Sequence, residues 1–562
     1  MDEKSDRRTR PSNGNQEQVN GALKSQISPP SISLPKGGGA IRGMGEKFAA
    51  NPVTGTGSMS VPIATSPGRS GFGPQLSLSY DSGAGNGPFG LGWNLALPSI
   101  TRKTDKGLPR YRDGEDFDEF ILSGAEDLVP VLVENQGNWE REKLDSRTVD
   151  HETYKIQRYR PRIEGLFARI ERWTNQGKPE ETFWRSISKD NITTWYGNSP
   201  ESRIADPANP ARIFSWLICE SYDDKGNVIV YRYKPEDSDE VNLSQVHEAN
   251  RSDTTRSANR YLKRIRYGNH APYFPELKDD KPWPSPPGAN TENGSEDWFF
   301  EVVLDYEDGH YSEDAPDGEG RVFARALPAP FASNPWRVRL DPFSTYRARF
   351  EVRTYRLCQR VLMFHHFPGV AGVEANCLVR STDFTYRYEQ DDTDHRNPIH
   401  SVLTSVSQCG YKRQADRYLK RALPPLEFSY SEVNIQDEVT EVDPESLENL
   451  PYGLDNGQYQ WVDLDGEGLS GILTQQGRGW FYKANLSPVS VRKEHGKPIL
   501  NARFGSLERV AEQPSLTALG GGQQLLDLAG DGQLDLVELE RPTPGFYERT
   551  HDERWETFRA FE

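Results

Sequence analysis

The stretch WLICESYDDKGNVIVYRY, residues 216–233, decides the fold class. It contains two runs in which apolar and aromatic residues alternate with polar ones, and the turn-forming residues 224–227 (DKGN) separate the runs. Alternation with a period of two is typical of a half-buried β-strand, and an Asp/Gly/Asn turn between two such runs is typical of a hairpin. The stretch therefore predicts two antiparallel strands joined by a short turn.

Runs of the same kind recur along the chain between turn-forming residues. They are YLKRIRYGN (261–269), WFFEVVLDYEDG (298–309), RARFEVRTYRLCQRVLMFHHF (347–367) and VRSTDFTYRYEQ (379–390). Aromatic residues make up 11% of the chain, and they suit pleated, half-solvated surfaces better than helix faces. Helix signals are scarce, so the sequence predicts an all-β protein whose main domain is a shell of β-hairpins.

Composition divides the chain into three parts. Residues 1–30 are polar and low in hydrophobic residues, which predicts a disordered arm. Residues 31–435 carry the alternating runs and are expected to form the β domain. The character changes near residue 430, where an acidic linker, NIQDEVTEVDPESLENL, leads into the last part, residues 436–562.

An internal repeat occupies residues 436–562. YQWVDLDGEGLSGILTQQGRGWFYKANL (459–486) is similar to QQLLDLAGDGQLDLVELERPTPGFYER (523–549), with Asp463 aligned on Asp527. Each copy predicts a strand, an Asp/Gly loop, a strand and an aromatic strand, which is the pattern of a propeller blade. Because two blades do not close a propeller, we expect a truncated chain whose unpaired strand edges promote association.

The Asp/Gly loops of the two copies are the candidate metal sites. They resemble the calcium loops of FG-GAP and VCBS repeats, in which D-x-D-G-x-G-x-x-D places carboxylates around one hard cation. Each loop lacks one carboxylate, because Gly471 stands at the ninth position of the first loop and Ala529 at the third of the second. A metal-free turn with aspartate-to-backbone hydrogen bonds is the first expectation, and calcium binding is the alternative. The residues that would hold calcium are Asp463, Asp465, Glu467, Asp527, Asp531 and Asp535.

The stretch SGAGNGPFGLGW, residues 82–93, contains the G-x-G-x-x-G spacing of a dinucleotide-binding turn at Gly85, Gly87 and Gly90. Such a turn needs a helix after it, and the proline in this stretch together with the strand-like residues that follow excludes one. The glycines are therefore predicted to be structural. They would allow left-handed turns and close backbone approach, with Trp93 packing over them.

The sequence contains few candidates for catalytic residues. The sequence has no G-x-S-x-G, Walker A or H-E-x-x-H motif. His365 and His366 are adjacent in an alternating run, so their rings are expected on opposite faces of a strand. The E-x-E triplets that begin at Glu140 and Glu538 are expected by chance in an acidic chain. We therefore expect no catalytic site, no cofactor and no enzymatic activity.

Charge and cysteine spacing exclude further classes. A formal net charge of −17 argues against a nucleic-acid-binding surface, which would need a basic face. The four cysteines are far apart without a C-x-x-C pair, which predicts free buried thiols. No Sec signal is visible and no run approaches the roughly 18 apolar residues of a membrane span. We expect a protein that is made in the cytoplasm, does not insert into membranes, and is secreted without a signal peptide.

Several long pieces between residues 34 and 111 resemble the start of the SpvB-type domain. They are LPKGGGAI, GTGSMSVPI, LSYDSGAGNGPFGLGW and ITRKTDKGLPRY. That domain opens the Salmonella virulence plasmid B protein and the B components of tripartite Tc (ABC) insecticidal toxin complexes. LPPLEFSY (423–430) and LPYGLDNGQYQWVDLDGEGLSGIL (450–473) resemble the continuation of the B component, where VCBS-like blades follow.

The resemblance implies a non-enzymatic scaffold. In the family, the B component and its C partner form a hollow β shell of RHS-like repeats that holds a cytotoxic effector. Its propeller docks on the pore-forming A component and gates release into the channel. YDDKGNVIVYRY (222–233) is itself similar to an RHS strand-turn-strand unit. The expected partners are therefore the A (pore) and C (effector-bearing) components.

Two alternatives stay open at this point. The first is an SpvB-like ADP-ribosyltransferase toxin whose catalytic domain is absent from this sequence, which a downstream glutamate pair beside an Arg-bearing strand would support. The second is a VCBS adhesin that binds glycans or a host protein, which complete metal loops and a signal peptide would favour.

Overall fold

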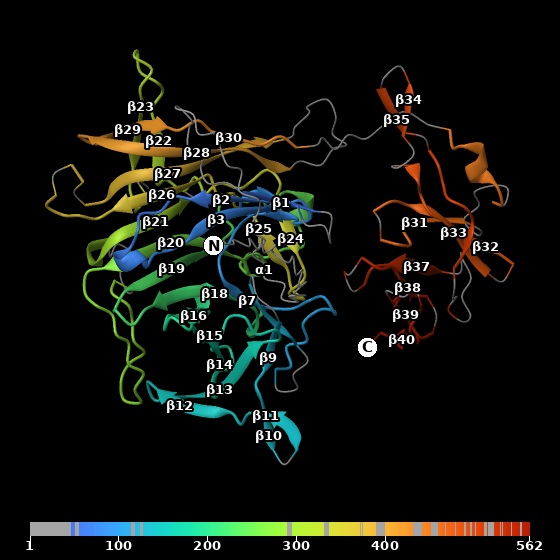
Figure 1. The fold of residues 1–562 in the computed structure, drawn as a ribbon, viewed down its shortest axis with the longest axis horizontal. Helices are drawn as coiled ribbons and strands as arrows, with labels where there is room; N and C mark the ends of the chain where they lie inside the picture. Colours follow the sequence, from blue (N-terminus) through green and yellow to red (C-terminus); the bar gives the residue numbers. More distant parts are fainter. Residues whose placement is uncertain are drawn as a thin grey trace, which may run out of the picture.

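The computed structural model is almost entirely β, and α1 (Asp253–Arg256) is the one α-helix among the described residues (Figure 1). The predicted all-β class is confirmed. The predicted arm, residues 1–30, and residues 434–440 of the acidic linker lie outside the described part. The structure describes residues 47–50, 56–113, 118–123, 127–135, 137–288, 295–330, 336–370, 372–373, 375–388, 400–430, 441–450, 459–466, 468–477, 479–487, 491–494, 497–500, 502–510, 514, 522–528, 530, 532–540, 542–550 and 554–561.

One sheet of 20 strands forms most of the protein. All of its pairings are antiparallel, and most join strands that are neighbours in the sequence. Its strands are β7 (Ser99–Arg102), β8 (Phe120–Leu122), β9 (Asp127–Pro130), β12 (Asp145–Val149), β13 (Glu152–Pro161), β14 (Arg169–Asn175), β15 (Thr182–Ile187), β16 (Thr193–Tyr196), β17 (Arg203–Asp206), β18 (Asn209–Tyr222), β19 (Val228–Pro235), β20 (Arg260–Asn269), β21 (Trp298–Asp305), β22 (Tyr311–Glu313), β23 (Val322–Ala326), β26 (Arg360–His365), β27 (Cys377–Tyr388), β28 (Ser401–Gln414), β29 (Arg417–Ala422) and β30 (Leu426–Glu427).

Smaller sheets accompany it. A four-stranded sheet holds β1 (Lys47–Ala50), β2 (Gly57–Ile63), β3 (Leu76–Asp81) and β6 (Trp93–Leu95). Two-stranded sheets are β4 (Asn86–Gly87) with β5 (Gly90–Leu91), β10 (Leu132–Asn135) with β11 (Asn138–Arg141), β24 (Phe343–Thr345) with β25 (Val352–Thr354), and β34 (Val491–Glu494) with β35 (Lys497–Leu500).

The hairpin predicted at residues 216–233 is present as the end of β18 and the start of β19. Its turn is held by Asp223, whose Oδ1 accepts the backbone N–H groups of Lys225 and Asn227 at 2.9 Å each. Gly226 adopts a φ of 81° inside this turn, a conformation that glycine reaches without strain. The turn residues therefore act as the sequence pattern indicates.

Eight strands of the large sheet close into a ring. The pairings run β13–β14–β15–β16–β18–β7–β8–β9 and return from β9 to β13. Aromatic rings from four of these strands meet inside the ring, where Trp184 lies 4.9 Å from Tyr159, 5.0 Å from Phe120 and 5.9 Å from Trp216 between ring centroids. Closure removes strand edges from this part of the sheet.

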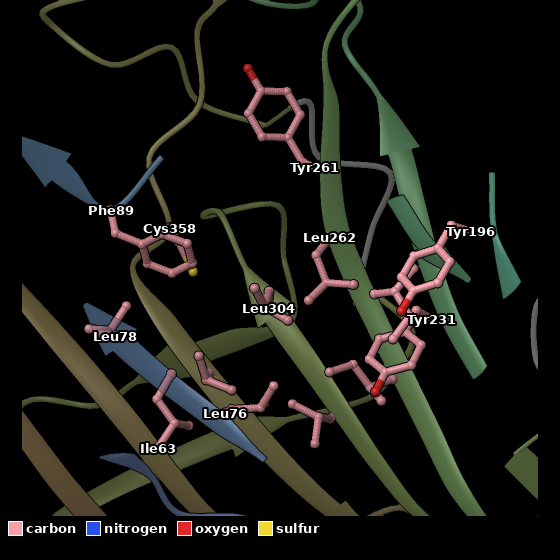
Figure 2. Close-up of a cluster of buried hydrophobic side chains, with 14 of the residues drawn as sticks. Ile63, Leu76, Leu78, Phe89, Tyr196, Tyr231, Tyr261, Leu262, Leu304 and Cys358 are labelled. Atoms are coloured by element: carbon pink, nitrogen blue, oxygen red, sulfur yellow. The ribbon is translucent and has the colours of Figure 1, made fainter. Parts of the chain in front are cut away.

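The four-stranded sheet of β1, β2, β3 and β6 packs on the large sheet. Apolar residues alternate along β2 and β3, so that Ile63, Leu76 and Leu78 are buried on one face. They share a core with Leu262 and Leu304 of the large sheet (Figure 2). The N-terminal strands are therefore buried against residues more than a hundred positions further along the chain.

Each copy of the C-terminal repeat supplies three strands of a four-stranded antiparallel sheet, and the fourth strand follows the copy in the sequence. Strand, loop, strand and aromatic strand follow one another in both copies as the sequence predicts (Figure 1). The two sheets share apolar contacts, because Leu536 of the second belongs to the same core as Leu473 and Trp480 of the first. The strands are β31 (Tyr459–Val462), β32 (Gly471–Gln476), β33 (Gly479–Lys483) and β36 (Glu508–Arg509), then β37 (Gln523–Leu526), β38 (Asp535–Glu538), β39 (Gly545–Tyr547) and β40 (Arg559–Ala560).

Candidate functional site

The glycine-rich stretch forms a tight strand corner, with Gly87 of β4 paired to Gly90 of β5. A strand, β6, follows it and no helix, so a dinucleotide-binding turn is absent here. A Cβ atom on Gly87 would lie 2.6 Å from the Trp93 carbonyl oxygen, and one on Gly90 would lie 2.6 Å from the Ser401 carbonyl oxygen. Gly90 also has a φ of 95°. Gly85 shows neither feature, because no atom lies within 4 Å of its Cβ position.

Trp93 fixes this corner to the far end of the β domain. Its side chain is 1% exposed, and its indole N–H donates to the Tyr430 hydroxyl at 2.8 Å. The ring centroid lies 4.9 Å from that of Phe428 and 5.2 Å from that of Tyr80. Trp93 therefore packs against aromatic rings from both ends of the domain.

In the first Asp/Gly loop, the described carboxylates bind N–H donors. Asp463 Oδ2 accepts the backbone N–H of Gly468 at 2.6 Å. Asp465 Oδ1 lies 3.4 Å from an Nη atom of Arg549, and the same guanidinium donates to the Leu464 carbonyl. Glu467 lies outside the described residues.

The second Asp/Gly loop has the same kind of bonding. The two carboxylate oxygens of Asp527 accept the N–H groups of Gly530 at 2.6 Å and Gly532 at 3.0 Å. Asp535 accepts the N–H groups of Leu528 and Arg549, both at 3.2 Å. Asp531 lies outside the described residues.

Arg549 connects the two loops and supplies a positive charge between them. It follows β39, is 4% exposed, and reaches from the second sheet to Leu464 and Asp465 of the first. Over the residues that the structure describes, no three His, Cys, Asp or Glu side chains are grouped as a metal site. The described carboxylates of the two loops thus accept hydrogen bonds from backbone N–H groups, and Asp465 also lies beside Arg549.

Calcium titration of the protein by calorimetry is expected to show no site tighter than roughly 0.1 mM, because oxygen count and charge set calcium affinity. The Asp463→Ala variant should give the same result as the unchanged protein. Micromolar binding that Asp463→Ala abolishes would contradict this prediction and identify the loops as metal sites.

The adjacent histidines bind different partners, as expected from strand alternation. The His365 Nε2 lies 2.6 Å from the Ser66 hydroxyl, and burial lowers the pKa of His365 to about 4. The His366 Nε2 lies 3.2 Å from a carboxylate oxygen of Glu301. Burial alone would raise the pKa of Glu301, but the nearby His366 and the charges of two neighbouring arginines lower it to about 2. This cluster is an internal ion-paired network.

The remaining expectations concern cysteines and membranes. All four cysteines are buried and free, which confirms the prediction from their spacing. Over the described part of the chain, no helix is long and apolar enough to cross a membrane.

The structure also contains a cavity of about 700 Å³ that is lined almost entirely by arginines and that no sequence pattern indicated. Its lining residues come from three separate segments, so no local motif marks it. They are Arg110, Tyr111, Arg112, Arg212 and Arg349, and we call this cavity the arginine pocket.

Comparison with known proteins gives a consistent group of relatives. The family described as Salmonella virulence plasmid 65kDa B protein, SpvB, matches residues 51–367, more than half of the chain. Mono(ADP-ribosyl)transferase SpvB of Salmonella choleraesuis and of Salmonella typhimurium are each 35% identical over 387 residues, or 69% of this chain. The chain spans only 57% of the length of these relatives.

Solved structures extend the likeness further along the chain. The Photorhabdus luminescens Tc holotoxin pore matches 96% of this chain at 29% identity with a TM-score of 0.64, using 22% of its own chain. The crystal structure of TcdB2-TccC3 matches 95% of this chain and 23% of its own at 29% identity, with a TM-score of 0.63. The N-terminal domain of effector protein SpvB from Salmonella typhimurium matches 63% of this chain and 98% of its own at 33% identity, with a TM-score of 0.51.

Proposed function

The chain belongs to the SpvB family, and on that premise we propose that it is a non-enzymatic component of a Tc-type toxin complex. Its β domain contributes to an RHS-like shell that encloses a cytotoxic effector together with a C-type component. Its C-terminal sheets are blades of a propeller that docks on a pore-forming A-type component. The protein acts after export from the producing cell.

The extent of the structural likeness is the observation that carries this proposal. The SpvB N-terminal domain accounts for 63% of the chain, whereas the Tc holotoxin structure accounts for 96%. Little of the chain lies outside the second alignment, so this alignment includes most of the two C-terminal sheets. The likeness to the Tc structures therefore extends beyond the SpvB-type domain into the two C-terminal sheets.

The closed ring of strands also supports a shell. Shell walls need sheets without free edges, and the ring from β7 to β18 has its strands paired on both sides. Aromatic side chains from four strands of the ring belong to one buried core, which favours a rigid wall element.

Docking through the C-terminal sheets is tested by capture of a Tc A-type pore component on the immobilised protein. Trp461 of β31 is 55% exposed, and exposed tryptophans dominate many protein interfaces. The Trp461→Ala variant is expected to bind the A-type component about tenfold more weakly or worse.

The matched control is Trp139→Ala on β11, where the side chain is 68% exposed but lies in the β domain. It should leave capture of the A-type component unchanged. No capture by the unchanged protein, or equal losses in both variants, would refute docking through these sheets.

An ADP-ribosyltransferase is the second candidate, because the curated relatives carry that name. The solved SpvB structure that this chain resembles is an N-terminal domain, and that resemblance supports the non-enzymatic proposal. Incubation with labelled NAD and a eukaryotic cell lysate should therefore give no protein labelling above a blank. Labelling above the blank would favour the transferase.

A further inference from the structure

A buried lysine of the large sheet faces a single carboxyl group. Lys263 of β20 has a side chain that is 12% exposed, and its Nζ lies 2.6 Å and 2.8 Å from the two carboxylate oxygens of Asp308. The same Nζ donates to the Leu304 carbonyl at 2.7 Å. Asp308 stands in the turn between β21 and β22, and its side chain is 6% exposed. Because the amine lies beside both oxygens, it also lies close to the carboxyl carbon that joins them.

The surroundings of this pair are apolar and aromatic. Leu304 belongs to the main hydrophobic core (Figure 2). The centre of the buried Tyr306 ring lies 5.6 Å from the Lys263 Nζ. A charged ammonium group is costly in such a place, and burial lowers the pKa of Lys263. A buried lysine that reaches its neutral form is a nucleophile.

A second buried carboxyl group stands next to the pair. Asp305 is the last residue of β21, and burial raises its pKa to about 6. Its Oδ2 lies 3.4 Å from an Nη atom of Arg360, and its Oδ1 accepts the backbone N–H of Glu307 at 3.1 Å. The charges of Lys263 and Asp308 both act on this carboxyl group. A carboxyl group that titrates in this range can take up a proton and return it.

The buried His310 accommodates one further proton. Its Nδ1 lies 3.1 Å from the Leu327 carbonyl oxygen, which can only accept, so Nδ1 carries the ring proton. Burial lowers the pKa of His310 to about 4, which leaves Nε2 as an acceptor. Among the described residues this Nε2 has no hydrogen-bond partner, and it lies 3.7 Å from a carboxylate oxygen of Asp308. Two acceptors that face each other call for a proton between them, and a neutral Asp308 carboxyl group supplies it.

We propose that Lys263 and Asp308 join in an intramolecular amide bond, with Asp305 carrying protons between them. The ammonium proton of Lys263 first passes to Asp308, which leaves a neutral amine beside a neutral carboxylic acid. The Nζ atom then attacks the carboxyl carbon, and an N–C bond forms. Asp305 takes the surplus proton from the nitrogen and returns it to the hydroxyl group, so that the C–O bond breaks and one water molecule leaves. The reaction needs no oxidant and no further reactant.

The burial that makes the ion pair costly favours the amide. Condensation removes two opposite charges from a site that is largely closed to water, and the exclusion of water also slows hydrolysis of the product. The bond clamps β20 to the turn between β21 and β22. The β domain alone carries this inference, which does not depend on the proposed function in a toxin complex.

Mass spectrometry of the intact full chain tests the proposal. The protein is expected to be lighter than its sequence mass by one water, and a proteolytic digest should contain a branched peptide that joins Lys263 to Asp308. The Lys263→Met and Asp308→Ala variants should have their full sequence masses. Asp305→Asn keeps both reacting groups but cannot carry the proton, so its cross-linked fraction in freshly purified protein should fall about tenfold or more.

Lys420→Met is the matched control, because the Lys420 Nζ also lies close to two carboxylates, 2.8 Å from Asp383 and 2.7 Å from Glu313. The Glu313 side chain is 39% exposed, however. Burial alone would lower the pKa of Lys420, but the charge of Asp383 raises it, so this amine stays protonated. Lys420→Met should therefore still be lighter than its own sequence mass by one water.

The outcomes separate the parts of the proposal. A full sequence mass for the unchanged protein, or a loss of water that persists in Lys263→Met, would overturn the amide bond. A digest of the unchanged protein without the branched peptide would overturn it too, whether or not the variants fold. Undiminished cross-linking in Asp305→Asn would overturn the role of Asp305.

Discussion

Replacing Arg356 with methionine is expected to lower the free energy of unfolding by about 3–5 kcal/mol. The Arg356 side chain is fully buried, and its guanidinium lies 2.7 Å from Glu236 and 2.8 Å from Asp237. It also donates to the Trp336 carbonyl, and its charge lies 4.5 Å from the centre of the Trp336 ring. Without Arg356, the buried Glu236 carboxylate keeps its hydrogen bond from Tyr261 at 2.6 Å but loses its counter-charge.

The pH dependence of the lost stability distinguishes the removal of the counter-charge of Glu236 from a simple packing defect. Burial raises the pKa of Glu236, and Arg356 opposes that rise. In the variant, the pKa of Glu236 in the folded state rises further above its value in the unfolded state. The folded protein therefore gains stability as the pH falls through that folded-state pKa and the carboxyl becomes neutral. The deficit of Arg356→Met should therefore be smaller at about pH 5 than at about pH 8.

Urea denaturation measures both effects. The control is Arg347→Met, because Arg347 is exposed and its loss should change stability by no more than about 0.5 kcal/mol. A deficit below about 1 kcal/mol, or one that grows on acidification, would show that Arg356 does not neutralise a buried charge.

Replacing Gly90 with alanine is the second change with a large expected effect. The new Cβ would lie 2.6 Å from the Ser401 carbonyl oxygen, and a φ of 95° is unfavourable for any residue with a Cβ. Because the nearest atom belongs to backbone, the strand corner or β28 has to move. Backbone strain and overpacking together predict a loss of about 2–4 kcal/mol.

Gly85→Ala is the matched control within the same motif. No atom lies within 4 Å of the Cβ position of Gly85, so the change should be neutral or stabilise by up to about 1 kcal/mol. Thermal and urea denaturation of the two variants give the comparison. Equal effects of the two substitutions would mean that the close approach of the Ser401 carbonyl does not require a glycine at position 90.

Local patterns predicted local structure well in this chain. The hairpin at 216–233 depends on alternation and on turn residues within five positions of one another, and both signals are contained in the stretch itself. The strand order of the two C-terminal repeats is likewise local, as are the aspartate-to-backbone bonds of Asp463 and Asp527.

Features made by distant segments gave no signal in the sequence. The ring closes because β18 pairs with β7. In this pairing Trp216 lies opposite Ile100, which is remote from it in the chain. The arginine pocket likewise needs three segments to meet, and Arg549 reaches Asp465 from another sheet. Such contacts depend on the complete fold, so single-segment patterns of charge and hydrophobicity do not show them.

The packing of the first small sheet on the large one has a consequence for biosynthesis. Val61 shares its core with Val406, so the ribosome adds more than three hundred residues between these two partners. At about 5–20 residues per second this takes roughly 20–70 s. During that interval the native cover of the apolar face of β2 and β3 is incomplete, so we expect the nascent chain to be a substrate for holding chaperones until β28 has been translated.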